Sequence, residues 1–228
     1  TMKYNPKTNE RQAALPGFGG AHPLLPEALS QGALQLMYDL EGLLREVTGL
    51  DAISLQPSAG AQGELAGMLI FYAHHASQGE RRTKIIIPDS AHGTNPASAA
   101  LCGFKPVPVK SSPRGVLAAD AIAAVMDTDT AGIMVTNPNT LGLFEENIHE
   151  IAAIVHAKGG LVYCDGANMN AVMGIVDMRA LGVDVLHLNL HKTFSTPHGG
   201  GGPACTSASS ATSGRRPTRS PPWISPSA

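Results

Sequence analysis

The sequence predicts an α/β protein built on a mostly parallel sheet. Short apolar runs typical of buried strands alternate with segments of helical period along most of the 228 residues. Most of these runs lead into turns rich in glycine, serine, threonine or asparagine. Parallel strands run in the same direction, so the turns that follow them meet at one edge of the sheet. Open α/β folds bind their ligands at that edge.

Composition narrows the classes of function. With 43% hydrophobic residues the chain can form one substantial core, and its length fits one or two domains. A formal charge of -2, without a basic stripe, argues against nucleic-acid and acidic-membrane partners. No apolar run approaches the roughly 20 residues of a membrane span, and the polar start is unlike a signal peptide. Three widely spaced cysteines favour a reducing, cytoplasmic compartment over a disulfide framework.

The predicted elements follow one another in order. The first 26 residues are irregular because prolines and glycines interrupt them. A helix over about 26–48 has leucines at helical spacing and ends at Gly49. A short strand near Ala52 then leads through a Ser/Gly-rich turn to a helix. The remaining expected helices cover 65–76, 97–102, 118–126 and 145–157, and the expected strands cover 84–88, 104–109, 131–136, 161–164 and 184–190.

The turn from Ser58 to Glu64 stands between a strand and a helix start. Unpaired backbone N–H groups and the positive end of a helix dipole suit a phosphate there. The turn matches neither the dinucleotide-binding fingerprint nor the P-loop, which needs a Lys-Ser/Thr pair after its last glycine. Taken alone, an ordinary strand-to-helix turn explains it equally well.

Lys192 stands where the last alternating strand ends. If partly desolvated, its amine would lose a proton more readily and could attack a carbonyl to form a Schiff base. A solvated loop lysine is the simpler interpretation of this stretch by itself. His92, in the turn after strand 84–88, could equally be a capping or core histidine.

The five polar turns become more informative when they are considered together. One fold brings to the same edge the turns Ser58–Gly63, His92–Asn95 and Asn137–Thr140, together with Asp165 and Lys192. A helix start can hold a phosphate, an acid can stabilise a protonated aromatic nitrogen, and a lysine can hold an aldehyde. These three features together describe a site for pyridoxal phosphate.

Six long runs also resemble a known family. They are Thr1-Met-Lys-Tyr-Asn-Pro-Lys, Gln56-Pro-Ser-Ala-Gly-Ala-Gln-Gly-Glu64, Ile87-Pro-Asp-Ser-Ala-His-Gly-Thr-Asn-Pro-Ala-Ser98, Thr136-Asn-Pro-Asn-Thr-Leu-Gly-Leu-Phe-Glu145, Tyr163-Cys-Asp-Gly-Ala-Asn-Met-Asn170 and His187-Leu-Asn-Leu-His-Lys-Thr-Phe-Ser-Thr-Pro-His-Gly-Gly-Gly-Gly-Pro203. They resemble the P-protein of the glycine cleavage system (glycine dehydrogenase, decarboxylating), in its carboxyl-terminal part or second subunit. The match extends from Thr1 to Pro203.

The resemblance implies the aspartate-aminotransferase-like large domain of fold type I, with helices on both faces of the sheet. It implies three catalytic residues: Lys192 would hold the cofactor as a Schiff base, Asp165 would pair with the pyridine nitrogen and His92 would stack on the ring. The phosphate would be bound at Ala59, Gly60, Ala61 and Gln62. Further neighbours of the cofactor or substrate would be Thr94, Asn137, Asn189, His191 and Thr193.

The activity implied by the resemblance is glycine decarboxylation that depends on pyridoxal phosphate, with transfer of an aminomethyl group to the lipoyl group of the H-protein. Glycine and the lipoyl H-protein would be its partners, with a partner subunit 1 or a second copy of the chain. The protein would be cytoplasmic, or in the mitochondrial matrix of a eukaryote.

The chain departs from the family's pattern after Pro203. We expect an N-terminal segment and helix over 1–48, a cofactor-binding domain over 49–203, and a tail over 204–228. The tail has no acidic residue and no helical or strand periodicity, and this composition predicts disorder. It resembles the product of another reading frame. Because the family's small C-terminal domain would then be missing, the alternative function is a truncated remnant that at most binds the cofactor or a partner subunit.

A metal site is the least favoured interpretation. Strand alternation places His187 and His191 on one face, with His198 further along the chain. No acid or thiol completes a familiar ligand spacing with these histidines, so we expect no metal.

Overall fold

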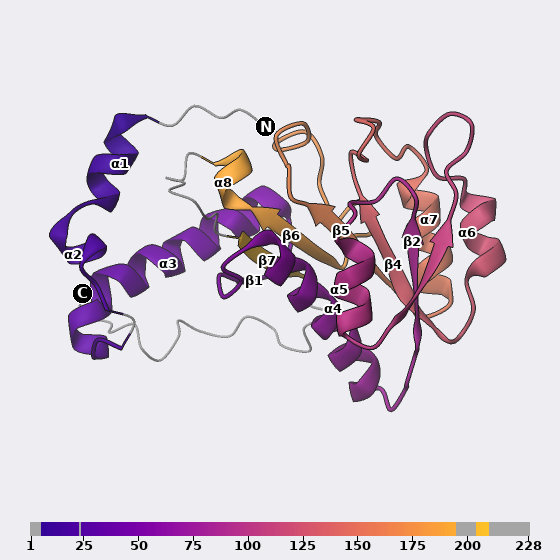
Figure 1. Ribbon diagram of the computed structural model, residues 1–228, viewed down its shortest axis with the longest axis horizontal. Coiled ribbons are helices and arrows are strands. Elements are labelled where there is room, and N and C mark those ends of the chain that lie inside the picture. The colour runs from indigo at the N-terminus through magenta and orange to yellow at the C-terminus, as the bar shows by residue number, and fades with distance from the viewer. Residues whose placement is uncertain (1–5, 23, 195–203, 210–228) are drawn as a thin grey trace.

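The computed structural model describes residues 6–22, 24–194 and 204–209. Its centre is a seven-stranded sheet with helices on both faces (Figure 1). The strand order is β1-β7-β6-β5-β4-β2-β3. Strands β2 to β6 are parallel, whereas β7 is antiparallel to both β6 and β1. The predicted α/β class with a mostly parallel sheet is therefore confirmed.

The elements lie close to their predicted positions. The strands are β1 Ala52–Ser54, β2 Lys84–Pro88, β3 Lys105–Val109, β4 Thr130–Thr136, β5 Leu161–Gly166, β6 Val185–Asn189 and β7 Ala204–Ala208. The helices are α1 Lys7–Ala13, α2 Pro16–Gly19, α3 Glu27–Thr48, α4 Gly60–Ser77, α5 Asn95–Leu101, α6 Ala119–Val125, α7 Ile148–Ala157 and α8 Leu190–Thr193. The largest shift is at α4, which begins five residues before the predicted Leu65.

The expectation of an irregular start is wrong, because the first described residues form the short helices α1 and α2. Their prolines lie at helix starts, with Pro6 just before α1 and Pro16 in the first position of α2. Proline is tolerated there because the first N–H groups of a helix have no intrahelical acceptor. These prolines therefore begin helices rather than interrupt them.

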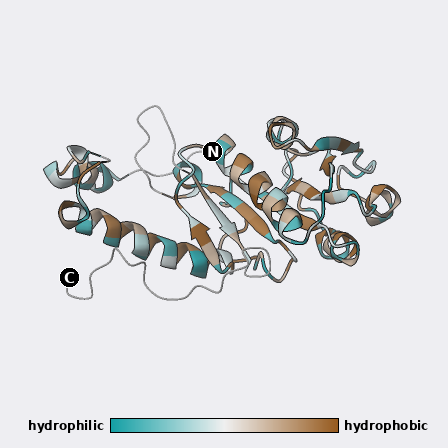
Figure 2. Ribbon diagram, turned by 90° about the horizontal axis from the view of Figure 1, so that it is seen from below, coloured by the Kyte–Doolittle hydropathy of each residue, from teal (hydrophilic) through white to brown (hydrophobic). Residues whose placement is uncertain are grey.

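Helix α3 has the predicted length, and among the described residues it packs on the core only through its C-terminal half. It extends away from the sheet and carries α1 and α2 beyond its far end (Figures 1 and 2). Leu44 and Thr48 are buried, whereas Leu29 is 72% exposed and Leu36 is 58% exposed. The helical spacing of the leucines is thus real, but within the described part of the chain only the C-terminal half of α3 contacts the core.

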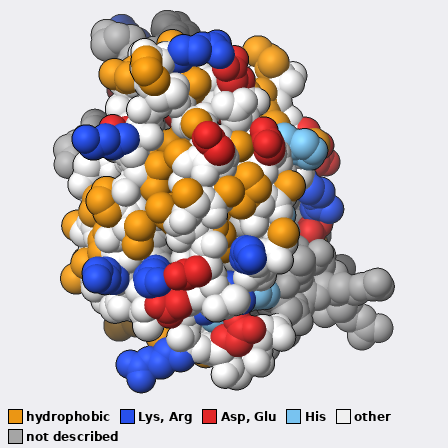
Figure 3. Space-filling model, turned by 90° about the vertical axis from the view of Figure 1, so that its right-hand side faces the viewer, with side chains coloured by type: hydrophobic (Ala, Val, Ile, Leu, Met, Phe, Trp, Pro, Cys, Tyr) orange, Lys and Arg blue, Asp and Glu red, His pale blue; other side chains and the backbone are white. Residues whose placement is uncertain are grey.

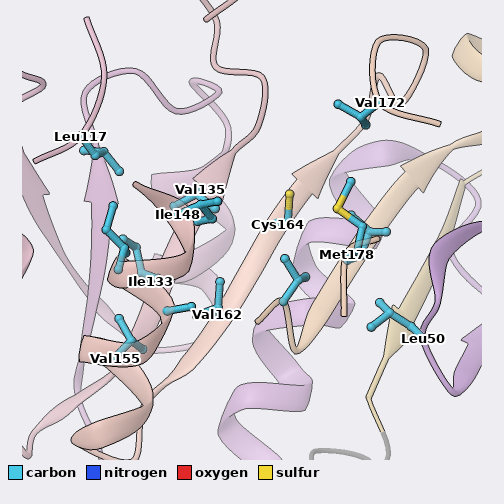
Figure 4. Close-up of a cluster of buried hydrophobic side chains, with 14 of the residues drawn as sticks. Leu50, Leu117, Ile133, Val135, Ile148, Val155, Val162, Cys164, Val172 and Met178 are labelled. Atoms are coloured by element: carbon cyan, nitrogen blue, oxygen red, sulfur yellow. The ribbon is translucent and has the colours of Figure 1, made fainter. Parts of the chain in front are cut away.

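Two apolar cores lie on opposite faces of the sheet. Side chains alternate along each strand, so Ile133 and Val135 of β4 enter one core and Met134 enters the other. The first core packs the strands against α6 and α7 (Figure 4). The second packs them against α4 through Met68 and Phe71. Burial on both faces explains why the strands read as continuous apolar runs in the sequence.

Three glycines on one face of α4 allow this helix to lie very close to the sheet. A Cβ atom would lie 2.7 Å from Asn189 at Gly60, 3.1 Å from His187 at Gly63 and 2.5 Å from Tyr163 at Gly67. Side chains at these positions would push the helix away from β5 and β6. The glycines therefore bring the start of α4 beside the carboxyl end of β6.

Replacing Gly67 with alanine should lower the free energy of unfolding by about 1–3 kcal/mol, as overpacking of a core does. The added methyl would overlap the buried ring of Tyr163. Urea unfolding of the two proteins measures the difference. Gly32→Ala is the control, because nothing lies within 4 Å of a Cβ at this position of α3. An equal effect at both positions would contradict the close approach of α4.

Residues 204–208 form β7, so the prediction of disorder is wrong for them. This strand lies between β1 and β6 and all five of its residues are buried. Its residues Ala-Cys-Thr-Ser-Ala are small and include no large apolar side chain, so the sequence carries no hydrophobic pattern for a strand. Backbone pairing on both sides decides the structure here. Residues 210–228 lie outside the described part of the chain.

Among the described helices, none is both long enough and apolar enough to cross a bilayer. The face drawn in Figure 3 carries acidic and basic side chains interspersed among apolar ones. This mixture agrees with the small formal charge of -2.

Candidate active site

A cavity of about 400 Å³ opens at the carboxyl ends of the parallel strands. His92 reaches it from the turn after β2, Asn139 from the turn after β4, Asp165 from the end of β5 and Lys192 from the residues after β6. Four of the five predicted turns therefore meet at one site. The fifth, Ser58–Gly63, does not contribute to the lining of this cavity.

Asp165 is a buried carboxylate with one oxygen left unpaired. Its Oδ1 accepts a hydrogen bond from the backbone N–H of Ala167 at 3.0 Å. Its Oδ2 is buried and has no hydrogen-bond partner among the described residues. A buried acceptor without a donor is costly, which marks this oxygen as the place where a bound molecule would supply an N–H or O–H group.

His187 lies on β6 opposite Asp165 and is completely buried. Its Nδ1 is 2.5 Å from the hydroxyl of Tyr163 and 3.5 Å from Oδ1 of Asp165. Burial lowers the pKa of His187, against the opposing effect of the Asp165 charge, and burial raises the pKa of Tyr163 well above its usual value. Tyr163 therefore keeps its proton, and its hydroxyl donates a hydrogen bond to Nδ1 of the neutral His187 ring.

Glu64 is a second buried carboxylate, and it contacts the turn that carries His92. Its Oε1 accepts from the hydroxyl of Thr94 at 2.6 Å and its Oε2 from the hydroxyl of Ser98 at 2.8 Å. The same Thr94 oxygen is 2.7 Å from Nδ1 of His92. We did not predict Glu64 as a site residue. An acid inside an otherwise apolar helix was the sequence feature that could have identified it.

Lys192 lies in α8, the single helical turn that follows β6 directly. Asn189 is the last residue before this helical turn, so the strand alternation stops before His191. The prediction that His187 and His191 share a strand face is therefore wrong, and His198 lies outside the described residues. The described groups that come closest to a metal-ligand set are instead Glu64, Asp165 and His187, whose ligand atoms lie within 4.8 Å of one another.

The other predicted cofactor neighbours do not line the cavity. Gln62 accepts from the backbone N–H of Ser58 at 2.7 Å, and Asn137 accepts from the backbone N–H of Glu145 at 3.0 Å. The Oδ1 atom of Asn189 is buried without a partner among the described residues. Thr193 accepts from the N–H of Met169 at 3.1 Å. The remaining members of this set are Ala59, Gly60, Ala61, Thr94 and His191.

The turn after β4 is held by Glu145, which we also did not predict. This carboxylate is 1% exposed and accepts from the N–H of Leu117 at 2.7 Å and from Nδ2 of Asn139 at 2.9 Å. Asn139 is thereby fixed on the cavity wall. A buried acid satisfied by N–H donors can anchor such a turn without a cationic partner.

The strand order, the antiparallel β7 and a lysine directly after β6 define the large domain of the fold type I transferases that depend on pyridoxal phosphate. The chain belongs to the aminotransferase class-V family, whose sequence model matches residues 63–202.

The sequence is similar to bacterial proteins described as probable glycine dehydrogenase (decarboxylating) subunit 2. The protein of Desulforamulus reducens is 62% identical over 204 residues, and that of Bacillus licheniformis is 57% identical over 204 residues. These matches cover 89% of the chain but only 42% of each relative. The chain therefore spans less than half the length of the curated relatives it matches.

Solved structures share the fold at lower identity. A glycine decarboxylase (P-protein) of the glycine cleavage system in inhibitor-bound form superposes with a TM-score of 0.73 at 21% identity, covering 94% of this chain and 48% of that one. A TDC from Oryza sativa, solved with PLP and tryptamine, gives a TM-score of 0.73 at 12% identity, and the match covers 93% of this chain and 52% of that one. These likenesses confirm the predicted fold class.

Proposed function

We propose that the chain binds pyridoxal 5'-phosphate and forms the cofactor-binding part of a glycine decarboxylase. The observation that carries this proposal is the unpaired, buried Oδ2 of Asp165 in the wall of a cavity that Lys192 also lines. The cavity volume of about 400 Å³ lies within the roughly 300–1,000 Å³ usual for small-molecule sites.

The residues present fit this cofactor. The orphan oxygen of Asp165 would accept from the protonated ring nitrogen, and its negative charge would favour that protonated form. The amine of Lys192 would hold the aldehyde, and His92 on the cavity wall would contact the ring. The first N–H groups of α4, at Gly60 and Ala61, have no intrahelical acceptors and would bind the phosphate.

When bound, the cofactor would supply an electron sink for the bond that breaks at the substrate's α-carbon. The chain's residues would bind and orient it: Asp165 would hold the ring charge and Lys192 would supply the amine that holds the aldehyde. Buried Glu145 keeps the Asn139 turn in place. The His187 ring, which is 3.5 Å from Oδ1 of Asp165, and the Tyr163 ring are both completely buried beside this carboxylate.

The particular reaction is proposed from the similarity to glycine dehydrogenase subunit 2. Glycine would be the substrate, and a lipoyl H-protein would accept the aminomethyl group. A partner subunit 1 or a second copy of the chain would complete the assembly. Residues 49–203 would form the cofactor-binding domain, and β7 (Ala204–Ala208) joins β1 to β6 within its sheet.

Exchange of labelled bicarbonate into glycine tests this function. The full chain, supplied with pyridoxal phosphate, a lipoyl H-protein and a subunit 1, should incorporate label above the level given by its Lys192→Ala variant. Equal incorporation by the two proteins would contradict the decarboxylase and favour a remnant that only binds.

A further inference from the structure

The hydroxyl of Thr94 links a buried carboxylate to a histidine of the cavity wall. It is 2.6 Å from Oε1 of Glu64 and 2.7 Å from Nδ1 of His92. Glu64 is 3% exposed, whereas the His92 side chain is 50% exposed. The three groups come from different parts of the fold, since Glu64 is on α4, Thr94 immediately precedes α5 and His92 lies in the turn after β2. Their alignment is therefore a product of the tertiary fold.

Counting protons determines which atom donates in each contact. A threonine hydroxyl has one proton, and a carboxylate can only accept. Both oxygens of Glu64 contact hydroxyl groups, and 2.6 Å is typical of an O–H···O⁻ bond. The Thr94 hydroxyl therefore donates a hydrogen bond to Glu64. The oxygen of that hydroxyl can then only accept a hydrogen bond from His92, so the ring proton must be on Nδ1.

One further contact competes with this arrangement. The backbone N–H of Thr94 lies 3.4 Å from Nδ1 of His92 and would require a bare Nδ1. That distance exceeds the usual N–H···O range of about 2.7–3.2 Å, so this bond is the weaker of the two. If Nδ1 of His92 carried no proton, the single hydroxyl proton of Thr94 would also have to be shared between two acceptors, Nδ1 and the charged carboxylate of Glu64.

We propose that Glu64 is a positioning residue that fixes the tautomer of His92 through Thr94. The relay keeps the proton on Nδ1 and leaves Nε2 of a cavity-lining imidazole free to accept a proton or a hydrogen bond. This inference rests on the proposed function for what His92 does at the cofactor. The tautomer itself requires neither cofactor nor activity.

A purely structural role for Glu64 makes a different prediction. Through Ser98, Oε2 already ties α4 to α5, and that bond does not involve His92. If Glu64 only joined the two helices, removing either hydroxyl would change stability and leave the imidazole unaffected. The matched pair Thr94→Val and Ser98→Ala separates the two roles, because each removes one hydroxyl bond to the same carboxylate.

The test is a long-range ¹H–¹⁵N NMR correlation of the full chain labelled at histidine, without cofactor, with the His92 signal identified by its loss in His92→Gln. Wild type and Ser98→Ala should show the Nδ1–H tautomer. Thr94→Val and Glu64→Met should lose it in favour of the Nε2–H form that free histidine prefers. Circular dichroism checks that each variant is folded, and Thr94→Val alone is sufficient if Glu64→Met does not fold.

A wild-type ring with its proton on Nε2 would overturn the relay, as would an unchanged tautomer in folded Thr94→Val. Loss of the Nδ1–H form in Ser98→Ala as well would assign the effect to general packing and would also overturn it. A correct tautomer in a chain that binds no pyridoxal phosphate would support the relay and reject the proposed function. A failure of the relay and a failure of the proposed function therefore give different results.

Discussion

Replacing Lys192 with alanine is expected to abolish the visible absorbance band that the wild-type chain should develop with pyridoxal phosphate. The band requires a Schiff base between an amine and the cofactor aldehyde, and Lys192 is the lysine that lines the described cavity. Titration of the purified chain with the cofactor, followed by absorbance spectroscopy, measures the effect. Loss should be complete, because alanine supplies no amine.

The matched control for this experiment is Lys105→Ala. Lys105 is exposed at the beginning of β3, at the edge of the sheet opposite the cavity. Lys105→Ala should develop the same absorbance band with pyridoxal phosphate as the wild-type chain. An unchanged spectrum in Lys192→Ala, or a loss shared by both variants, would reject Lys192 as the amine that holds the cofactor.

Asp165→Asn is expected to weaken cofactor binding on the order of 100-fold, because one partner of a buried charge pair is neutralised. Asparagine keeps the size of the side chain but no longer balances a protonated ring nitrogen. Equilibrium dialysis with 4'-deoxypyridoxine 5'-phosphate measures the affinity directly. This analogue has no aldehyde, so the result is independent of Lys192.

Two controls make the Asp165 result specific. Asp120→Asn removes a carboxylate that is exposed on α6 and should leave the affinity unchanged. An analogue with carbon in place of the ring nitrogen should bind wild type and Asp165→Asn alike. Equal affinity of the two proteins for 4'-deoxypyridoxine 5'-phosphate would show that Asp165 does not contact the ring nitrogen.

The predictions from the sequence were confirmed where one hydrophobic periodicity or one turn residue was sufficient to define an element. Strand β4 reads as a continuous apolar run, and both of its faces are buried. Helix α3 ends at Gly49, whose φ of 72° is the left-handed conformation that glycine adopts at little cost. The convergence of His92, Asp165 and Lys192 followed from the parallel direction of the strands that precede them.

The predictions failed where contacts between distant segments decide the structure. Strand β7 has only small side chains and is held by pairing with β1 and β6, which no local period reveals. Glu64 and His92 are 28 positions apart and are joined through Thr94 only after α4 packs on α5. The first half of α3 has a core-like spacing, but its large apolar side chains are largely exposed and no described segment forms a core beside them.

The sequence by itself determined the α/β class, the order of the elements, and the polar residues that reach one edge of the sheet. These follow from side-chain periodicity and backbone chirality, which are local properties of the chain. Only the tertiary structure decided which carboxylate oxygen lacks a donor, how closely α4 approaches β6, and where the protons of the Glu64–Thr94–His92 relay lie. Those properties depend on distances of a few tenths of an ångström between segments far apart in the sequence, and these distances exist only after the helices have packed on the sheet.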